Sequence, residues 1–170
     1  MILVADLQLE EQAESLEALA AKSDVQFLHF RPWIARIERD IRVHLELPFS
    51  RAVTDELRRI ITVFVEFIAE DLAVAPGTGR RPVTAPAKLK QLQKTGEKIL
   101  ADLGPYAQLA DHYYDDRVKR ERLSRPSNEV SAEIDAITEK AKDLWERIVE
   151  YLNDLSQVIK ETSAHDEAPG

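Results

Sequence analysis

Apolar residues in the last third of the chain recur at alternating spacings of four and three, a pattern that keeps their side chains on one face of an α-helix. The stripe consists of Val130, Ile134, Ile137, Ala141, Leu144, Ile148, Tyr151, Leu155 and Val158. A third heptad position adds Trp145, Leu152 and Ile159. This width is typical of a bundle helix with two or more neighbours. The pattern predicts one long helix, in which residues 130 to 158 span about 43 Å.

Similar stripes predict further helices earlier in the chain. We expect them over residues 7–22, from Pro32 to Pro48, and over 49–73, 87–103 and 105–122. Residues 60–69 are apolar nearly all round, which indicates a central, buried helix. Gly104 and Pro105 are expected to end one helix and begin the next. Residues 23–30 fit either a short helical turn or an extended connector.

The predicted fold class is all-α, an antiparallel bundle of five to six helices with a long C-terminal heptad helix. Its core is expected to come from the apolar faces of residues 49–73, 87–103 and 126–161. We expect residues 1–161 to form a single domain with a Pro/Gly/Arg loop over 74–86. Residues 162–170 are predicted to be a disordered tail.

The amino-acid composition limits the cellular compartments and the kinds of chemistry that we expect for this protein. The chain is 44% hydrophobic and 32% charged, a balance that favours a soluble, folded protein. It contains no cysteine, which excludes disulfides, thiolate nucleophiles and cysteine-containing zinc sites. The first residues lack the basic region of a signal peptide, and no apolar run approaches the roughly 20 residues of a membrane span. We therefore expect a cytoplasmic protein without membrane contact.

Charge is distributed unevenly around a net value of −8. Basic residues gather between Arg80 and Lys98 and again over 117–125, whereas residues 129–161 are mainly acidic. The clusters favour phosphate contacts, and nucleic acid is therefore a possible partner. The candidate contacts are Arg80, Arg81, Arg117, Lys119, Arg120 and Arg122. The alternative is that these bases complement helix dipoles and pair with the acidic last helix.

One short motif carries possible catalytic chemistry. The run Arg39-Asp40-Ile41-Arg42-Val43-His44 resembles the Arg-x4–6-His signature of the HEPN ribonucleases, helical bundles that dimerise to bring two such motifs together. The resemblance implies that His44 is a general acid or base in metal-independent RNA cleavage, with Arg39 stabilising phosphate and Asp40 as the polar residue after it. The alternative is that His44 continues the Ile37–Ile41 stripe as a helix histidine while Arg39 is solvated.

A metal centre is not expected. His112 and Asp116 are four residues apart and could reach one ion if a single helix carries both. However, no Glu-x-x-His occurs in the chain, so the ligand set of a di-iron bundle is incomplete. We predict no metal and no cofactor.

These observations favour a non-catalytic helical-bundle interaction or assembly subunit, which we expect to be a homodimer or to bind a protein partner through its C-terminal helix. The expected interface residues are Trp145, Ile148, Tyr151, Leu152 and Leu155, since large apolar side chains dominate interface energies. The first alternative is a HEPN-like ribonuclease of toxin or defence type using Arg39 and His44. The second is a nucleic-acid-binding subunit using the clusters at 80–98 and 117–125.

Overall fold

The structure is a computed structural model and describes residues 4–22, 25, 27–44, 48–72 and 86–167. Within these residues it contains helices and no strand, so the predicted all-α class is confirmed. The elements are α1 (Val4–Ala20), a 3₁₀ turn η1 (Phe27–Phe30), α2 (Arg31–His44), α3 (Arg51–Leu72), α4 (Pro86–Tyr114), α5 (Asp116–Leu123) and α6 (Ser127–Glu167). None of the described helices combines the length and apolar character needed to cross a bilayer.

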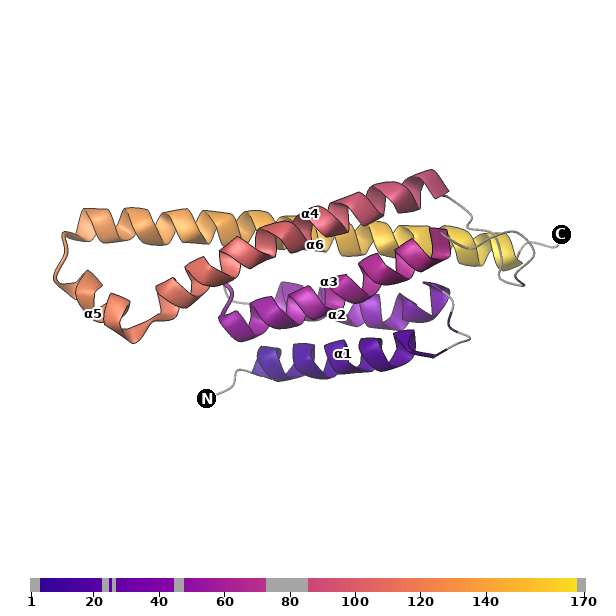
Figure 1. The fold of residues 1–170 in the computed structure, drawn as a ribbon, viewed down its shortest axis with the longest axis horizontal. Coiled ribbons are helices and arrows are strands. Elements are labelled where there is room, and N and C mark those ends of the chain that lie inside the picture. Colours follow the sequence, from indigo (N-terminus) through magenta and orange to yellow (C-terminus); the bar gives the residue numbers. More distant parts are fainter. Residues whose placement is uncertain (1–3, 23–24, 26, 45–47, 73–85, 168–170) are drawn as a thin grey trace.

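The helices lie side by side, with α3 between α1 and α4, and α6 against α4 and α2 (Figure 1). The α4 and α6 helices run in opposite directions, because Lys88 pairs with Glu161 near one end while Asp102 pairs with Arg147 further along. Both helices continue past the ends of α1, α2 and α3, and α5 joins them at the tip (Figure 1). We call residues 109–136 the distal hairpin.

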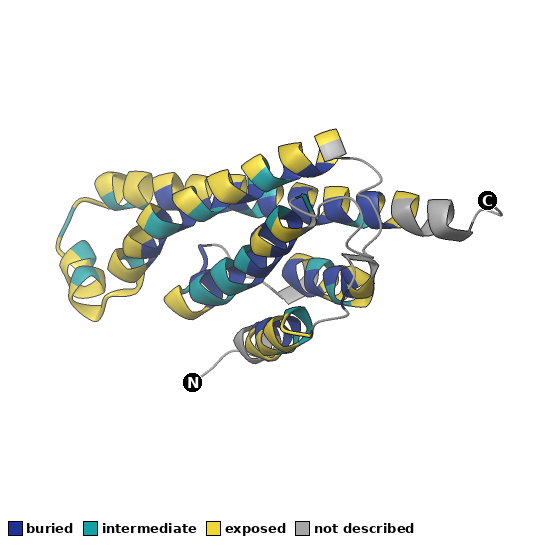
Figure 2. Cartoon of the chain, turned by 45° about the vertical axis from the view of Figure 1, so that its right-hand side comes forward, coloured by how far each residue is buried: buried dark blue, intermediate teal, exposed yellow. Residues whose placement is uncertain are grey.

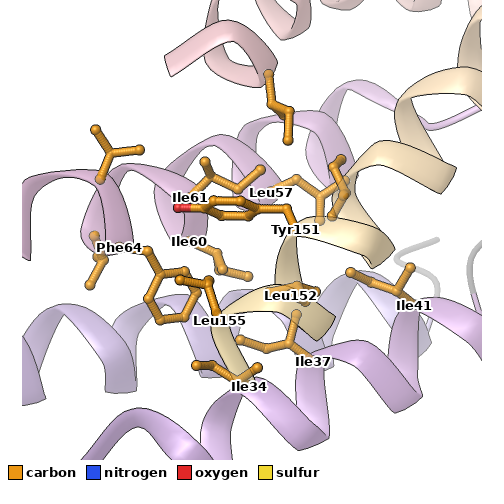
Figure 3. Close-up of a cluster of buried hydrophobic side chains, with 14 of the residues drawn as sticks. Ile34, Ile37, Ile41, Leu57, Ile60, Ile61, Phe64, Tyr151, Leu152 and Leu155 are labelled. Carbon is orange, nitrogen blue, oxygen red and sulfur yellow. The ribbon is translucent and has the colours of Figure 1, made fainter. Parts of the chain in front are cut away.

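The core lies where α2, α3 and α6 meet (Figure 3). Tyr151, Leu152 and Leu155 of α6 pack among isoleucines of α2 and the apolar residues of α3 around Phe64. Burial follows the helical period, with buried residues on one side of each outer helix and exposed residues on the other (Figure 2). The hydrophobic stripes of the sequence therefore position the core.

The predicted break at Gly104–Pro105 is wrong, since α4 runs without interruption from Pro86 to Tyr114. Proline in a helix removes one backbone hydrogen bond, a cost that tertiary packing can offset. Here the Pro105 ring is exposed, while Leu103 and Tyr106 on either side of it are buried. The real break comes at Asp115, which caps α5.

The end of the chain also differs from expectation. Helix α6 continues to Glu167, past the start of the predicted tail at residue 162. No glycine or proline interrupts the sequence before Pro169, and the ion pair between Lys88 and Glu161 joins α6 to α4 nearby. The predicted loop over 74–86 falls almost wholly outside the described residues, as do residues 168–170.

Candidate interaction surfaces

The structure places the expected interface residues of α6 inside the single chain. Ile148, Tyr151, Leu152 and Leu155 are buried in the core, and Trp145 is half-buried with its indole N–H 3.4 Å from the Ile41 carbonyl oxygen. These side chains offer no free surface, because α2 and α3 already cover this part of the α6 seam. Any contact with a partner in the folded chain has to use other residues.

The Arg39–Asp40–His44 motif lies on α2. Asp40 is 8% exposed and accepts a hydrogen bond from the Gln12 amide of α1, while the Arg39 side chain is 71% exposed. Arg39 Nε lies 3.7 Å from Asp40 Oδ1. The side chain of His44 lies outside the described residues. The hydrogen bond of Asp40 thus joins α2 to α1. This contact is what we expect of a residue with a structural role.

No residue of α5 is buried, and this helix is held to the end of α4 by a cap and by ring contacts. The Asp115 carboxylate accepts hydrogen bonds from the backbone N–H groups of Arg117 (2.8 Å) and Val118 (3.1 Å). Arg122 folds back on α4, donating to the Tyr113 carbonyl oxygen at 2.9 Å with its guanidinium 4.9 Å from the Tyr113 ring centroid. This clamp fixes α5 against the end of α4.

The basic residues of 117–125 have different surroundings. Arg125 pairs with Glu133 and Glu129, and these contacts raise the pKa of Arg125 and lower that of Glu133, chiefly through their hydrogen bond. Lys119 lies 5.5 Å from the Tyr114 ring centroid. Arg117 and Arg120 are exposed and make no ion pair with any described residue. Pairing with the acidic last helix, the predicted alternative, is therefore present at Arg125 but not at Arg117 or Arg120.

The first basic cluster is only partly described. Arg80 and Arg81 lie outside the described residues, and Lys88 pairs with Glu161 at 2.9 Å. Lys90, Lys94 and Lys98 are exposed on α4 and have no ion-pair partner among the described residues. Their spacing of four places them along one side of the helix.

Exposed apolar area is concentrated in the distal hairpin. Among the described residues, the large hydrophobic side chains that reach the surface are Leu109 (37% exposed), Tyr114 (36%) and Leu123 (87%). All three belong to this one segment, although it forms a small part of the chain. The sequence had placed Leu109 on the core-facing stripe, because its spacing alone could not show that this side chain faces a groove between α4 and α6.

A groove of about 420 Å³ runs between α4 and α6 on the side away from α3. Its apolar floor is formed by Pro105, Tyr106, Leu109 and Leu144. Its rim carries the ion pair of Arg147 with Asp102 (2.7 Å) and Asp143 (3.4 Å), together with Glu139 and Lys140. We call this side of the molecule the outer α4–α6 face. This face cannot be read from the sequence, because a groove depends on how two helices meet.

A second groove, of about 460 Å³, lies between the end of α1 and α3. Arg59 closes its centre by pairing with Glu17 and Glu56. The pKa of Glu56 is raised above its ordinary value, chiefly because the carboxyl group is partly buried. Arg59 lowers this pKa, whereas the nearby Glu10 and Glu17 raise it. The ion pair between Arg59 and Glu17 fastens α1 to α3 at this groove.

Possible metal ligands are not brought together. His112 lies in α4 and Asp116 in α5, on either side of the break at Asp115, and both are exposed. The i,i+4 relation assumed for one continuous helix is therefore absent. Among the described residues there is no group of three or more histidine, aspartate and glutamate side chains placed to hold an ion.

Comparison of the chain with protein-family models, with curated proteins and with solved structures gives no match in any of the three. Functional interpretation therefore depends on the residues and their geometry.

Proposed function

We propose that this chain is a non-catalytic, antiparallel helical-bundle interaction subunit, which makes its contacts through the long α4–α6 pair and the distal hairpin. The observation that carries the proposal is the position of Leu109, Tyr114 and Leu123, the exposed large hydrophobics of the described chain. Exposed apolar area confined to one segment marks a contact surface more often than scattered apolar residues do.

The shape of the molecule supports the same proposal. The tip of the distal hairpin, formed by α5 and the start of α6, extends past the other helices, so a partner reaches it without displacing the bundle (Figure 1). Its base is tied to α3 by the ion pair of Asp111 with Arg51 at 2.7 Å. The groove between α4 and α6 is lined by apolar side chains and by the ion pairs of Arg147 with Asp102 and Asp143, and no serine, threonine, cysteine or histidine of the described chain lines it. Such a surface is suited to binding a partner rather than to chemistry on a substrate.

A nucleic-acid contact is the second candidate. The observation that favours it is that Arg117 and Arg120 are exposed and form no ion pair within the part of the chain that the structure describes. Charge argues against it. Residues 111–125 contain five bases but also four acids, and the chain as a whole carries −8. The rings of Tyr113 and Tyr114 lie edge to face at 4.9 Å, and each already lies near a cation, so stacking on a base would displace these contacts. Because phosphate contacts supply most non-specific affinity, we rank this function below protein binding.

The ribonuclease alternative remains a prediction. It requires Arg39 and His44 to act together on RNA, whereas the hydrogen bond from Gln12 supports a structural role for Asp40. Loss of RNA turnover in both Arg39→Ala and His44→Ala, with the fold intact, would support the enzyme. Unchanged turnover would remove it.

Site-specific photo-crosslinking tests the proposed function. A photoreactive amino acid replaces Leu109 or Leu123 in cells that natively express the protein, and a third variant carries it at Glu11, an exposed position on α1. We expect crosslinks to a polypeptide from positions 109 and 123 but not from position 11. Absence of crosslinks from the first two positions, or equal crosslinking from all three, would overturn the proposal.

A further inference from the structure

We infer that the outer α4–α6 face binds a second copy of this chain, about a twofold axis parallel to the two helices. This inference rests on the proposed function and names its partner. It is carried by a basic line on α4 (Lys94 and Lys98) and an acidic line on α6 (Glu146, Glu150 and Asp154), which lie beside each other on this face and make no ion pair with any described residue.

The basic line continues the row of α4 residues that lines the groove. Asp102, Pro105 and Leu109 line the groove, and the helical period extends this row back to Lys98 and Lys94 at steps of four. Both lysines are exposed and have no ion-pair partner among the described residues. Each step of four residues advances about 6 Å along the helix.

The acidic line extends the row of α6 residues on the opposite wall in the same way. Glu139 and Asp143 line the groove, and the row continues through Glu146, Glu150 and Asp154 at steps of three or four. Glu146, Glu150 and Asp154 are exposed and make no ion pair with any described residue. The spacing of Glu150 and Asp154 equals that of Lys94 and Lys98.

The ion pairs of the single chain fix the level of the two lines. Lys88 pairs with Glu161, and Asp102 pairs with Arg147, so these residues mark matching heights along the two antiparallel helices. Counting along each helix from these pairs places Lys94 at the height of Asp154 and Lys98 at the height of Glu150, to within about one residue. Rotation about a twofold axis parallel to the helices leaves every residue at the same height along the axis and brings α4 of one copy opposite α6 of the other. It therefore places Lys94 and Lys98 of one copy opposite Asp154 and Glu150 of the other, and the reverse.

The same operation covers the apolar part of the face. Leu109 and Pro105 of one copy come opposite the α6 segment around Lys140 and Leu144 of the other. The face is thus self-complementary, as an interface about a twofold axis must be. A partner whose surface carries only positive or only negative charge would place like charges against either the lysines or the carboxylates. The arrangement therefore favours a second copy, which offers both signs of charge.

The test is a charge exchange followed by light scattering after size-exclusion chromatography, across a range of protein concentrations. The wild-type chain, with a monomer mass of 19.3 kDa, is expected to show twice that mass at high concentration. Lys94→Glu with Lys98→Glu, and separately Glu150→Lys with Asp154→Lys, should each weaken self-association by about tenfold or more, because opposed charges become like charges. Mixing the two variants should restore a dimer containing one chain of each.

The matched control reverses two exposed cations outside α4 and α6, Lys22→Glu with Arg31→Glu, and should leave the dimer unchanged. A wild-type chain that is monomeric throughout, or two variants that dimerise normally alone, would overturn the inference. Two variants that fail to recombine when mixed, although each is folded by circular dichroism, would do the same.

The crosslinking experiment separates failure of this inference from failure of the proposed function. Crosslinks from position 109 to the same chain support both. Crosslinks to a different polypeptide keep the interaction subunit and exclude the second copy. Absence of crosslinks removes the proposed function itself.

Discussion

Gly96 lies where α4 packs closely against Val65 of α3 and Tyr151 of α6. A Cβ atom at this position would lie 2.6 Å from Val65 Cγ2 and 2.8 Å from the Tyr151 hydroxyl oxygen. Both distances are shorter than van der Waals contact, and the Tyr151 side chain is fully buried. The sequence already indicated a close helix approach here, because a glycine on the apolar face of a helix is costly unless close packing requires it.

We predict that Gly96→Ala destabilises the protein by about 1–2 kcal/mol, since overpacking outweighs the gain of up to about 1 kcal/mol in helix propensity. Gly104→Ala is the matched control in the same helix, because its Cβ would meet only Arg58 Nη2 at 3.9 Å. That variant should be neutral or more stable. Urea unfolding of both variants measures the difference, and a Gly96→Ala protein as stable as the wild type would contradict the described contact.

Two buried tyrosines should respond in opposite directions to removal of the hydroxyl. The Tyr106 hydroxyl oxygen accepts a hydrogen bond from the buried Phe49 N–H at 2.9 Å, whereas the Tyr151 hydroxyl has no partner among the described residues. Tyr106→Phe leaves a buried donor unsatisfied and should cost about 1–3 kcal/mol. Tyr151→Phe removes an unsatisfied group and should be neutral or stabilising. The same unfolding measurement decides, and equal destabilisation by both would show that Tyr151 has a bonding partner.

Alkaline pH should weaken the fold through these residues. Burial raises the pKa of Tyr106 from its ordinary 10.0 to about 12, and burial raises the pKa of Tyr151 as well. The unfolded chain therefore releases these protons first as pH rises, so the stabilisation is complete below pH about 10 and is lost as pH rises through about 12. We expect the free energy of unfolding to fall across this interval, and to fall less in Tyr151→Phe. A wild-type protein with constant stability there would contradict the burial of both hydroxyl groups.

At the scale of elements, the helical periods predicted α1, α2, α3 and the seam of α6, since each stripe has one face to bury. They failed at Pro105, where packing on both sides of the proline holds the helix together. They also assigned Trp145, Tyr151 and Leu152 to a free surface, because a heptad stripe shows which residues are buried but not whether the neighbour is the same chain or another.

The short helix α5 depends on its cap. We predict that Asp115→Ala frays α5 and destabilises the protein by about 1 kcal/mol, because two backbone N–H groups lose their acceptor. Faster amide hydrogen exchange over residues 116–123, with unchanged exchange in α3, would confirm it. Asp116→Ala serves as the control, since its carboxylate accepts no hydrogen bond among the described residues, and equal exchange in the two variants would argue against the cap.

At the scale of the whole molecule, composition and periodicity were sufficient for the fold class but not for the candidate site. The outer α4–α6 face arises where two helices meet in a fixed register, and that register is not visible in one stripe. The exposure of Leu109 and the alignment of Lys94 and Lys98 with Asp154 and Glu150 became visible only with the helices in place.

Hydrogen–deuterium exchange at low and high protein concentration tests the central claim most directly, because it locates the contact surface on the intact chain. We predict that protection increases with concentration in segments 94–109 and 139–154 and stays constant in α1 and α2. Concentration-independent exchange throughout, or protection gained elsewhere, would contradict the claim that the outer α4–α6 face is where this protein meets its partner.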